Sequence, residues 1–97
     1  MSDVAMVPVR VRLPPVLRQV VGGRVELIAK GNSIGAVIDD LAARWPALAL
    51  HFFDERGAIR RNVLFLHRGE AIRPPEASSR LVDEDDEVIV TNALAGG

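Results

Sequence analysis

The segment of this chain best suited to chemistry is its end, residues 93–97 with the sequence "ALAGG". A C-terminal carboxylate is anionic and resonance-stabilised, so it reacts poorly until it is joined to AMP as a mixed anhydride. Because glycine has no Cβ, a Gly96-Gly97 end can enter a narrow nucleotide site on another protein. We therefore take Gly97 as the candidate adenylation site, and Gly96, Ala95 and Leu94 as the residues that give access to it.

Such a tail needs a second contact elsewhere on the protein. Ordering each tail residue on docking costs roughly 1–2 kcal/mol of conformational entropy. Alternation of apolar residues in "NVLFLH" and "VIVTN" puts Leu64, Leu66, Ile89 and Thr91 on the side of their strands that faces away from the expected core. These four residues are the candidate partner-binding patch, and we expect Leu64, Leu66 and Ile89 to be exposed together.

Other reaction chemistries lack the residues they need. The chain has no cysteine, which excludes a thiolate nucleophile and a disulfide. His51 and His67 have no third ligand at metal spacing, and His67 continues the inward alternation of its strand. The acidic run at 83–87 starts like a calcium loop, but Val88 stands where the turn glycine belongs. The "GNSIG" segment is no dinucleotide fingerprint, and no phosphate-binding loop is present, so we expect no metal or cofactor bound by this chain.

Composition limits the partners and the compartment. The 97 residues carry a formal net charge of -1, so we expect no nucleic-acid partner and no attraction to an anionic membrane. No segment approaches the roughly 20 apolar residues of a membrane span, and a cytoplasmic location is the expectation. The length fits one domain over 1–92 followed by a flexible tail at 93–97.

Hydrophobic periodicity predicts strand, strand, helix, strand, short strand, strand. Strands are expected at 7–13, 24–29, 62–68, 70–72 and 88–92. The main helix is expected over 34–45, with Ser33 as its N-cap and Pro46 preventing continuation. We expect residues 47–61 to be irregular, with partial core at Phe52 and Phe53, and residues 74–87 to form a loop with one helical turn at most. One helix covers one face of such a sheet and leaves the other open.

These segments together resemble the ThiS/MoaD family of ubiquitin-like sulfur carriers, and most closely its CysO-type members. The resemblance lies in "LPPVLRQVVGG", "GNSIGAVIDDL", "RGEAIR", "LVDEDDEVIV" and the terminal "ALAGG", in that order along nearly the whole chain. It implies an α+β fold of the β-grasp type, with a mixed four- to five-stranded sheet and one main helix packed across one face.

The resemblance also implies a function. An E1-like enzyme using ATP and magnesium would adenylate Gly97, and sulfur transfer would convert the carboxylate to a thiocarboxylate. The chain would then be a protein co-substrate rather than an enzyme. In CysO-type systems the sulfur passes to a cysteine-synthase-like enzyme and a metalloprotease releases cysteine. In MoaD systems the acceptor is the large subunit of molybdopterin synthase, and in ThiS systems the sulfur enters the thiamin thiazole.

Two positions depart from the family pattern, and two other classes stay open. The family usually has Gly-Asp before its last strand, whereas this chain has Asp85-Asp86, so a different turn is expected there. Arg68 stands where asparagine is common. A ubiquitin-like modifier joined to lysines would use the same activated carboxylate, and a binding-only β-grasp module would not need the tail.

Overall fold

The structure is a computed structural model that describes residues 6–92. Its strands are β1 (Val7–Arg12), β2 (Glu26–Gly31), β3 (Val63–His67), β4 (Glu70–Ile72) and β5 (Glu87–Asn92). Its helices are α1 (Pro15–Arg18), the 3-10 turn η1 (Gln19–Val21), α2 (Ile34–Arg44), α3 (Pro46–Phe52) and α4 (Pro74–Ala77).

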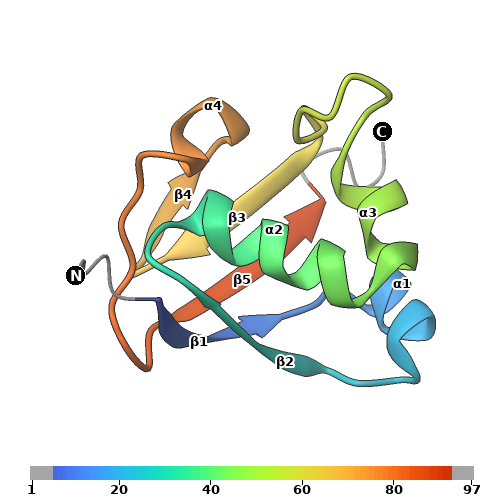
Figure 1. The fold of residues 1–97 in the computed structure, drawn as a ribbon, viewed down its shortest axis with the longest axis horizontal. Coiled ribbons are helices and arrows are strands. Elements are labelled where there is room, and N and C mark those ends of the chain that lie inside the picture. The colour runs from blue at the N-terminus through green and yellow to red at the C-terminus, as the bar shows by residue number, and fades with distance from the viewer. Residues whose placement is uncertain (1–5, 93–97) are drawn as a thin grey trace.

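The strands form one mixed sheet in the order β2-β1-β5-β3-β4. β1 pairs antiparallel with β2 and parallel with β5, and β3 lies antiparallel to both β5 and β4. The helix α2 lies across one face of this sheet (Figure 1). The predicted α+β architecture, a mixed sheet with one main helix across one face, is therefore confirmed. The last strand, β5, occupies the centre of the sheet.

Strict alternation along the strands builds the core. Val9 and Val11 of β1 are buried, while Arg10 and Arg12 between them are exposed. The register places Val9 opposite Ala29 of β2, which is also buried, so neighbouring strands turn the same set of residues toward α2. Because a slip of one residue would reverse every side chain, this alternation fixes the register as well as the face.

The helix α2 begins and ends where its residues indicate. The Ser33 hydroxyl oxygen accepts a hydrogen bond from the Ala36 N–H at 3.1 Å, which satisfies one of the free donors of the first turn. Ile34, Val37 and Ile38 are among the residues of α2 that are fully buried against the sheet. The helix ends at Arg44, one residue before the predicted end, and Pro46 prevents its continuation as predicted.

The prediction that residues 47–61 are irregular was wrong for their first part. Pro46 does stop α2, but it also occupies the first turn of a new helix, α3, where its missing N–H is not needed. Leu48 and Phe52 lie one turn apart on α3 and are both fully buried, whereas Phe53 is half-buried. The short helix α1 and the turn η1 were also not predicted, since the 14–23 segment was interpreted only as the link between two strands.

The "GNSIG" segment serves close packing. A Cβ on Gly31 would lie 2.7 Å from the backbone nitrogen of Val37, a separation that real atoms do not reach. A Cβ on Gly35 would lie 3.1 Å from the Cα of Ser78, in the residues that follow α4. The two glycines therefore let β2 and the end of α4 approach the first turn of α2, although glycine lowers helix propensity at Gly35.

Two turns contain non-glycine residues with positive φ. Arg68 and Gly69, at φ 54° and 80°, join β3 to β4 through a two-residue hairpin loop of the kind that needs positive φ at both positions. Asp85 has φ 69° in the turn before β5, so this aspartate does adopt the left-handed conformation for which glycine is better suited.

Candidate functional site

The four residues of the predicted patch lie together on the open face of the sheet. Leu66 of β3 is directly opposite Ile89 of β5, and Leu64 is directly opposite Thr91. The Thr91 hydroxyl donates a hydrogen bond to the Leu64 carbonyl oxygen at 3.3 Å. This register confirms that the four side chains share one face. All four are half-buried, so Leu64, Leu66 and Ile89 are less exposed than expected.

A charged turn borders this patch. A groove of about 450 Å³ runs from Leu66 and Ile89 to Arg68 and Asp86. One guanidinium nitrogen of Arg68, Nη2, lies 2.5 Å from an oxygen of Asp83 and 3.2 Å from an oxygen of Asp86. An apolar centre with a charged rim is the usual composition of a protein-docking surface.

His67 lies behind that rim, with its side chain only 1% exposed. Its Nδ1 accepts a hydrogen bond from Nε of Arg80 at 2.9 Å, and its Nε2 lies 2.8 Å from Asp86 Oδ2. A guanidinium can only donate, so Nδ1 carries no proton and Nε2 is the donor to Asp86 in the neutral ring. Arg80 also forms an ion pair with Glu70 of β4. The histidine is thus a structural core residue, as its alternation predicted.

The Asp86 carboxylate is held in its ionised form. Burial by itself raises the pKa of Asp86, but hydrogen bonds from the Asp83 backbone N–H, from His67 and from Arg68 outweigh burial and lower the pKa below its usual value. The same contacts raise the pKa of Arg68, chiefly through its hydrogen bond to Asp83. The charges on this rim therefore persist across the physiological pH range.

The network formed by these charged residues was not predicted from the sequence. The acidic run 83–87 was predicted only as part of a loop, and Arg68 only as a departure from a family pattern. The signal that could have linked them is the alternation that places His67 inward, because a buried imidazole needs polar partners on both nitrogens. Within residues 6–92, no group of three or more metal-ligating side chains occurs.

The candidate reactive residue lies outside the described residues. Gly97, Gly96, Ala95 and Leu94 all follow Asn92, the last residue of β5. Five residues span at most about 17 Å when fully extended, so the chain end stays within that distance of the β5 terminus. The strand β5 therefore carries two residues of the patch, Ile89 and Thr91, and also leads into the tail.

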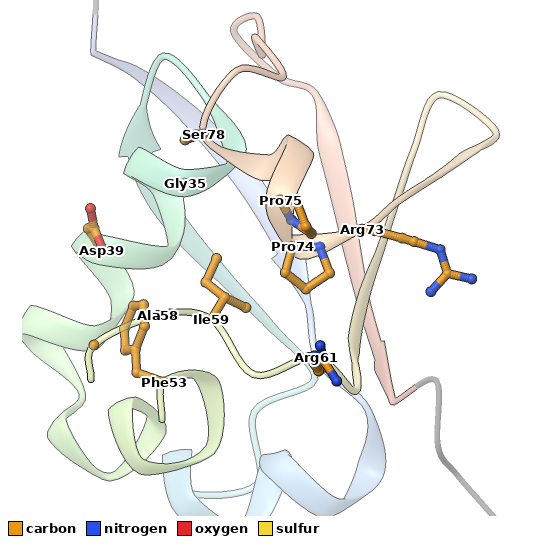
Figure 2. A pocket seen from close by; sticks show the side chains of 11 residues that line it. Gly35, Asp39, Phe53, Ala58, Ile59, Arg61, Arg73, Pro74, Pro75 and Ser78 are labelled. Carbon is orange, nitrogen blue, oxygen red and sulfur yellow. The ribbon is translucent and has the colours of Figure 1, made fainter. Parts of the chain in front are cut away.

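A second hollow on the described surface contains none of the predicted site residues. It has a volume of about 600 Å³ and lies between α2, the 53–61 segment and α4. Figure 2 shows Pro74, Pro75 and Ile59 around it, with the Arg73 side chain directed away from them. Its apolar lining continues the core and holds no pair of groups suited to acid–base chemistry.

Comparison with solved structures first defines the class of protein. The solution structure of small archaeal modifier protein 1 from Methanosarcina acetivorans matches with a TM-score of 0.78 and 28% identity, over 95% of this chain and 98% of that chain. A chain of the Amycolatopsis orientalis BexX/CysO complex matches with a TM-score of 0.77 and 27% identity, over 92% and 99% of the two chains. The protein is a ubiquitin-like β-grasp protein.

Sequence comparison then defines the family, although no protein-family profile matches the chain. The sulfur carrier proteins CysO of Mycobacterium tuberculosis and of Mycobacterium bovis are each 31% identical to it over 91 residues, which is 92% of this chain and 98% of theirs. The chain belongs to the CysO family of sulfur carrier proteins. It is a protein substrate that donates sulfur, and partner proteins carry out the catalysis. In the described part of the chain, no helix has the length and hydrophobicity needed to cross a bilayer.

Proposed function

We propose that Gly97 is the sulfur-carrying residue and that cysteine is the product that receives the sulfur. The Gly97 carboxylate attacks the α-phosphate of ATP on an E1-like enzyme, with magnesium neutralising the phosphates, and pyrophosphate leaves. A sulfide equivalent then displaces AMP and leaves a thiocarboxylate. In this proposal, ATP and magnesium are bound by the activating partner.

The observation that supports this proposal is the position of the patch on the strand from which the tail continues. Leu66 and Ile89 lie on β3 and β5, and β5 leads directly into the tail. When a partner docks on these strands, its nucleotide site can therefore lie within the short reach of the tail. The 31% identity to CysO proteins supports cysteine, with a cysteine-synthase-like enzyme as sulfur acceptor and a metalloprotease for release.

The experiment is a charging reaction on the full chain. Incubation with the E1-like enzyme, ATP, magnesium and sulfide should raise the intact mass by one exchange of oxygen for sulfur. Deletion of Gly97 should abolish this change, whereas Leu81→Asp, an exposed residue outside the patch, should leave it intact. Charging of the truncated chain would show that Gly97 is not the sulfur-carrying residue.

The similarity to an archaeal modifier protein favours one second candidate, attachment to lysines of other proteins. An isopeptide bond would form when a lysine amine, rather than sulfide, attacks the adenylated Gly97. Such conjugates resist reducing agents and hydroxylamine, whereas a thiocarboxylate reacts with alkylating reagents. A blot of cell extract for conjugates of higher mass distinguishes the two, and their absence excludes the modifier function under the conditions tested.

A further inference from the structure

The strand β2 forms an open edge of the sheet. Among residues 6–92 it pairs with β1 alone, and Figure 1 shows it as the outermost strand beneath α2. The Arg10 N–H of β1 donates to the Asp86 carbonyl oxygen at 2.9 Å and so points toward β5. In an antiparallel pair, two opposite residues direct their backbone groups either toward each other or both away from each other. Ile28 lies opposite Arg10, so it directs its N–H and C=O away from the sheet. Glu26 and Lys30 share this outward direction.

Two side chains of α2 reach these outward backbone groups. An oxygen of the Asp40 carboxylate accepts a hydrogen bond from the Lys30 N–H at 3.0 Å. The Arg44 guanidinium donates to the Ile28 carbonyl oxygen at 2.6 Å, and it also donates to the same oxygen of Asp40 at 2.8 Å. We call this pair the edge clamp. The edge clamp occupies one backbone donor, the Lys30 N–H, and one backbone acceptor, the Ile28 carbonyl oxygen. An added strand would need both groups for its own hydrogen bonds.

The chemistry of the clamp matches the edge in a specific order. A carboxylate can only accept and a guanidinium can only donate, so Asp40 and Arg44 could not exchange places. As an ordinary ion pair one helical turn apart, with the side chains 30% and 51% exposed, the two residues would add little stability. Their contacts to the backbone of Lys30 and Ile28 therefore indicate a role at the strand edge.

The exposed edge is complementary to itself. If two β2 strands met antiparallel about a twofold axis at Ile28, Glu26 of one copy would lie opposite Lys30 of the other. The Ile28 side chains, each 51% exposed in the single chain, would meet at the centre. Opposite charges and apolar contacts across such a pair are the interactions that stabilise an antiparallel ladder.

We propose that the edge clamp of Asp40 and Arg44 keeps this protein monomeric by closing the β2 edge to a second copy of the same chain. Side-chain blocking of an unpaired edge is a recognised way in which proteins avoid edge-to-edge association. The partner excluded by the clamp is specifically β2 of another molecule, because the Glu26, Ile28 and Lys30 positions complement themselves.

The test exchanges the two side chains. The double variant D40R/R44D keeps an ion pair at the same helix positions and keeps the net charge, but it places a donor at the Lys30 N–H and an acceptor at the Ile28 carbonyl. Hydrogen exchange of the Lys30 amide at low protein concentration should accelerate by about tenfold. Light scattering should show a dimer whose fraction increases with protein concentration. Asp39→Ala, which removes the neighbouring carboxylate of α2, is the matched control and should stay monomeric.

A third substitution tests the register of the dimer. Glu26→Lys added to D40R/R44D should dissociate the dimer, because lysine would then face lysine, and adding Lys30→Glu as well should restore it. If D40R/R44D does not fold, Asp40→Ala provides the same two measurements. A variant that remains monomeric at millimolar concentration, or a dimer that is insensitive to Glu26→Lys, would overturn the proposal.

Discussion

His67 of β3 and Asp86 of the turn before β5 are joined by a hydrogen bond of 2.8 Å between Nε2 and Oδ2. This contact links the strand that carries Leu66 to the turn that leads into Ile89. Because Arg80 fixes the other ring nitrogen as an acceptor, the proton of the neutral imidazole can only point to Asp86. The buried pair therefore sets the geometry of the rim beside the patch.

The first prediction concerns acid stability. The pKa of Asp86 is lowered in the folded chain, so its carboxylate contributes stability above its unfolded-state pKa, and this contribution is lost as the pH falls through the folded pKa. We expect the free energy of unfolding to decrease below about pH 4, and Asp86→Asn to flatten that decrease. Urea titrations at several pH values measure this pH dependence of the free energy of unfolding. Asp85→Asn keeps a residue suited to positive φ. This variant should retain the wild-type slope of the free energy of unfolding against pH.

The second prediction concerns the same contact at neutral pH. Asp86→Ala would leave the buried Nε2–H of His67 without its acceptor, which typically costs about 1–3 kcal/mol. Urea denaturation at pH 7 measures this loss. Asp83→Ala removes an exposed carboxylate that also contacts Arg68, and it should cost much less. Equal losses for the two variants would contradict a special role for the His67 contact.

The third prediction concerns Gly31. A methyl group there would meet backbone atoms of Ala36 and Val37, which cannot rotate away. We expect Gly31→Ala to lower the free energy of unfolding by about 1–3 kcal/mol, as overpacking does in cores. Thermal denaturation provides the measurement. Gly22→Asn is the control, because nothing lies near a Cβ at Gly22 and asparagine accepts its positive φ.

The fourth prediction concerns the start of α2. Ser33→Ala removes the hydroxyl that accepts from the Ala36 N–H, and an N-cap of this kind contributes about 1 kcal/mol. Ser33→Asp should recover most of the loss, since its carboxylate also accepts at the positive end of the helix dipole. Ser78→Ala, at an exposed serine, should be neutral. Equal free energies of unfolding for Ser33→Ala and Ser78→Ala in denaturant titrations would show that the cap contributes nothing.

The fifth prediction concerns the patch and rests on the proposed function. Leu66→Asp places a charge at the centre of the apolar surface and should reduce the rate of charging by an E1-like enzyme at least tenfold, because desolvating a carboxylate opposes docking. The circular dichroism spectrum should be unchanged, since Leu66 is only half-buried. Leu50→Asp alters an equally apolar but exposed residue on α3 and should charge normally.

Periodicity was enough to predict the sheet and α2, but not the segments around them. Alternation in β1 and β3 follows directly from one buried face, and Ser33 is a strong local start signal for a helix. Helix α3 was missed because a proline that ends one helix was not also considered as the first residue of the next. The seven residues of α3 carry too short an apolar stripe to be recognised without the core that Leu48 and Phe52 complete.

The contacts within the site depend on distances that a sequence does not contain. Leu66 and Ile89 could be assigned to one face by alternation, but their partial burial depends on the side chains around them. The pairing of Arg68 with Asp83 and Asp86 joins residues 15 and 18 positions apart. The contact of Asp40 with Lys30 depends on where the helix crosses the strand edge. Such contacts follow from the packing of α2 and the turns on the sheet.

The central position of β5 also determines how the body responds to mechanical load. A partner that pulls on the segment beyond Asn92 loads the ladders to β1 and β3 at the same time, in shear along the strands. An edge strand under the same force would be held by one ladder instead of two. Under the proposed function, in which the tail enters the sites of partner enzymes, this double ladder would resist unfolding of the domain by those enzymes.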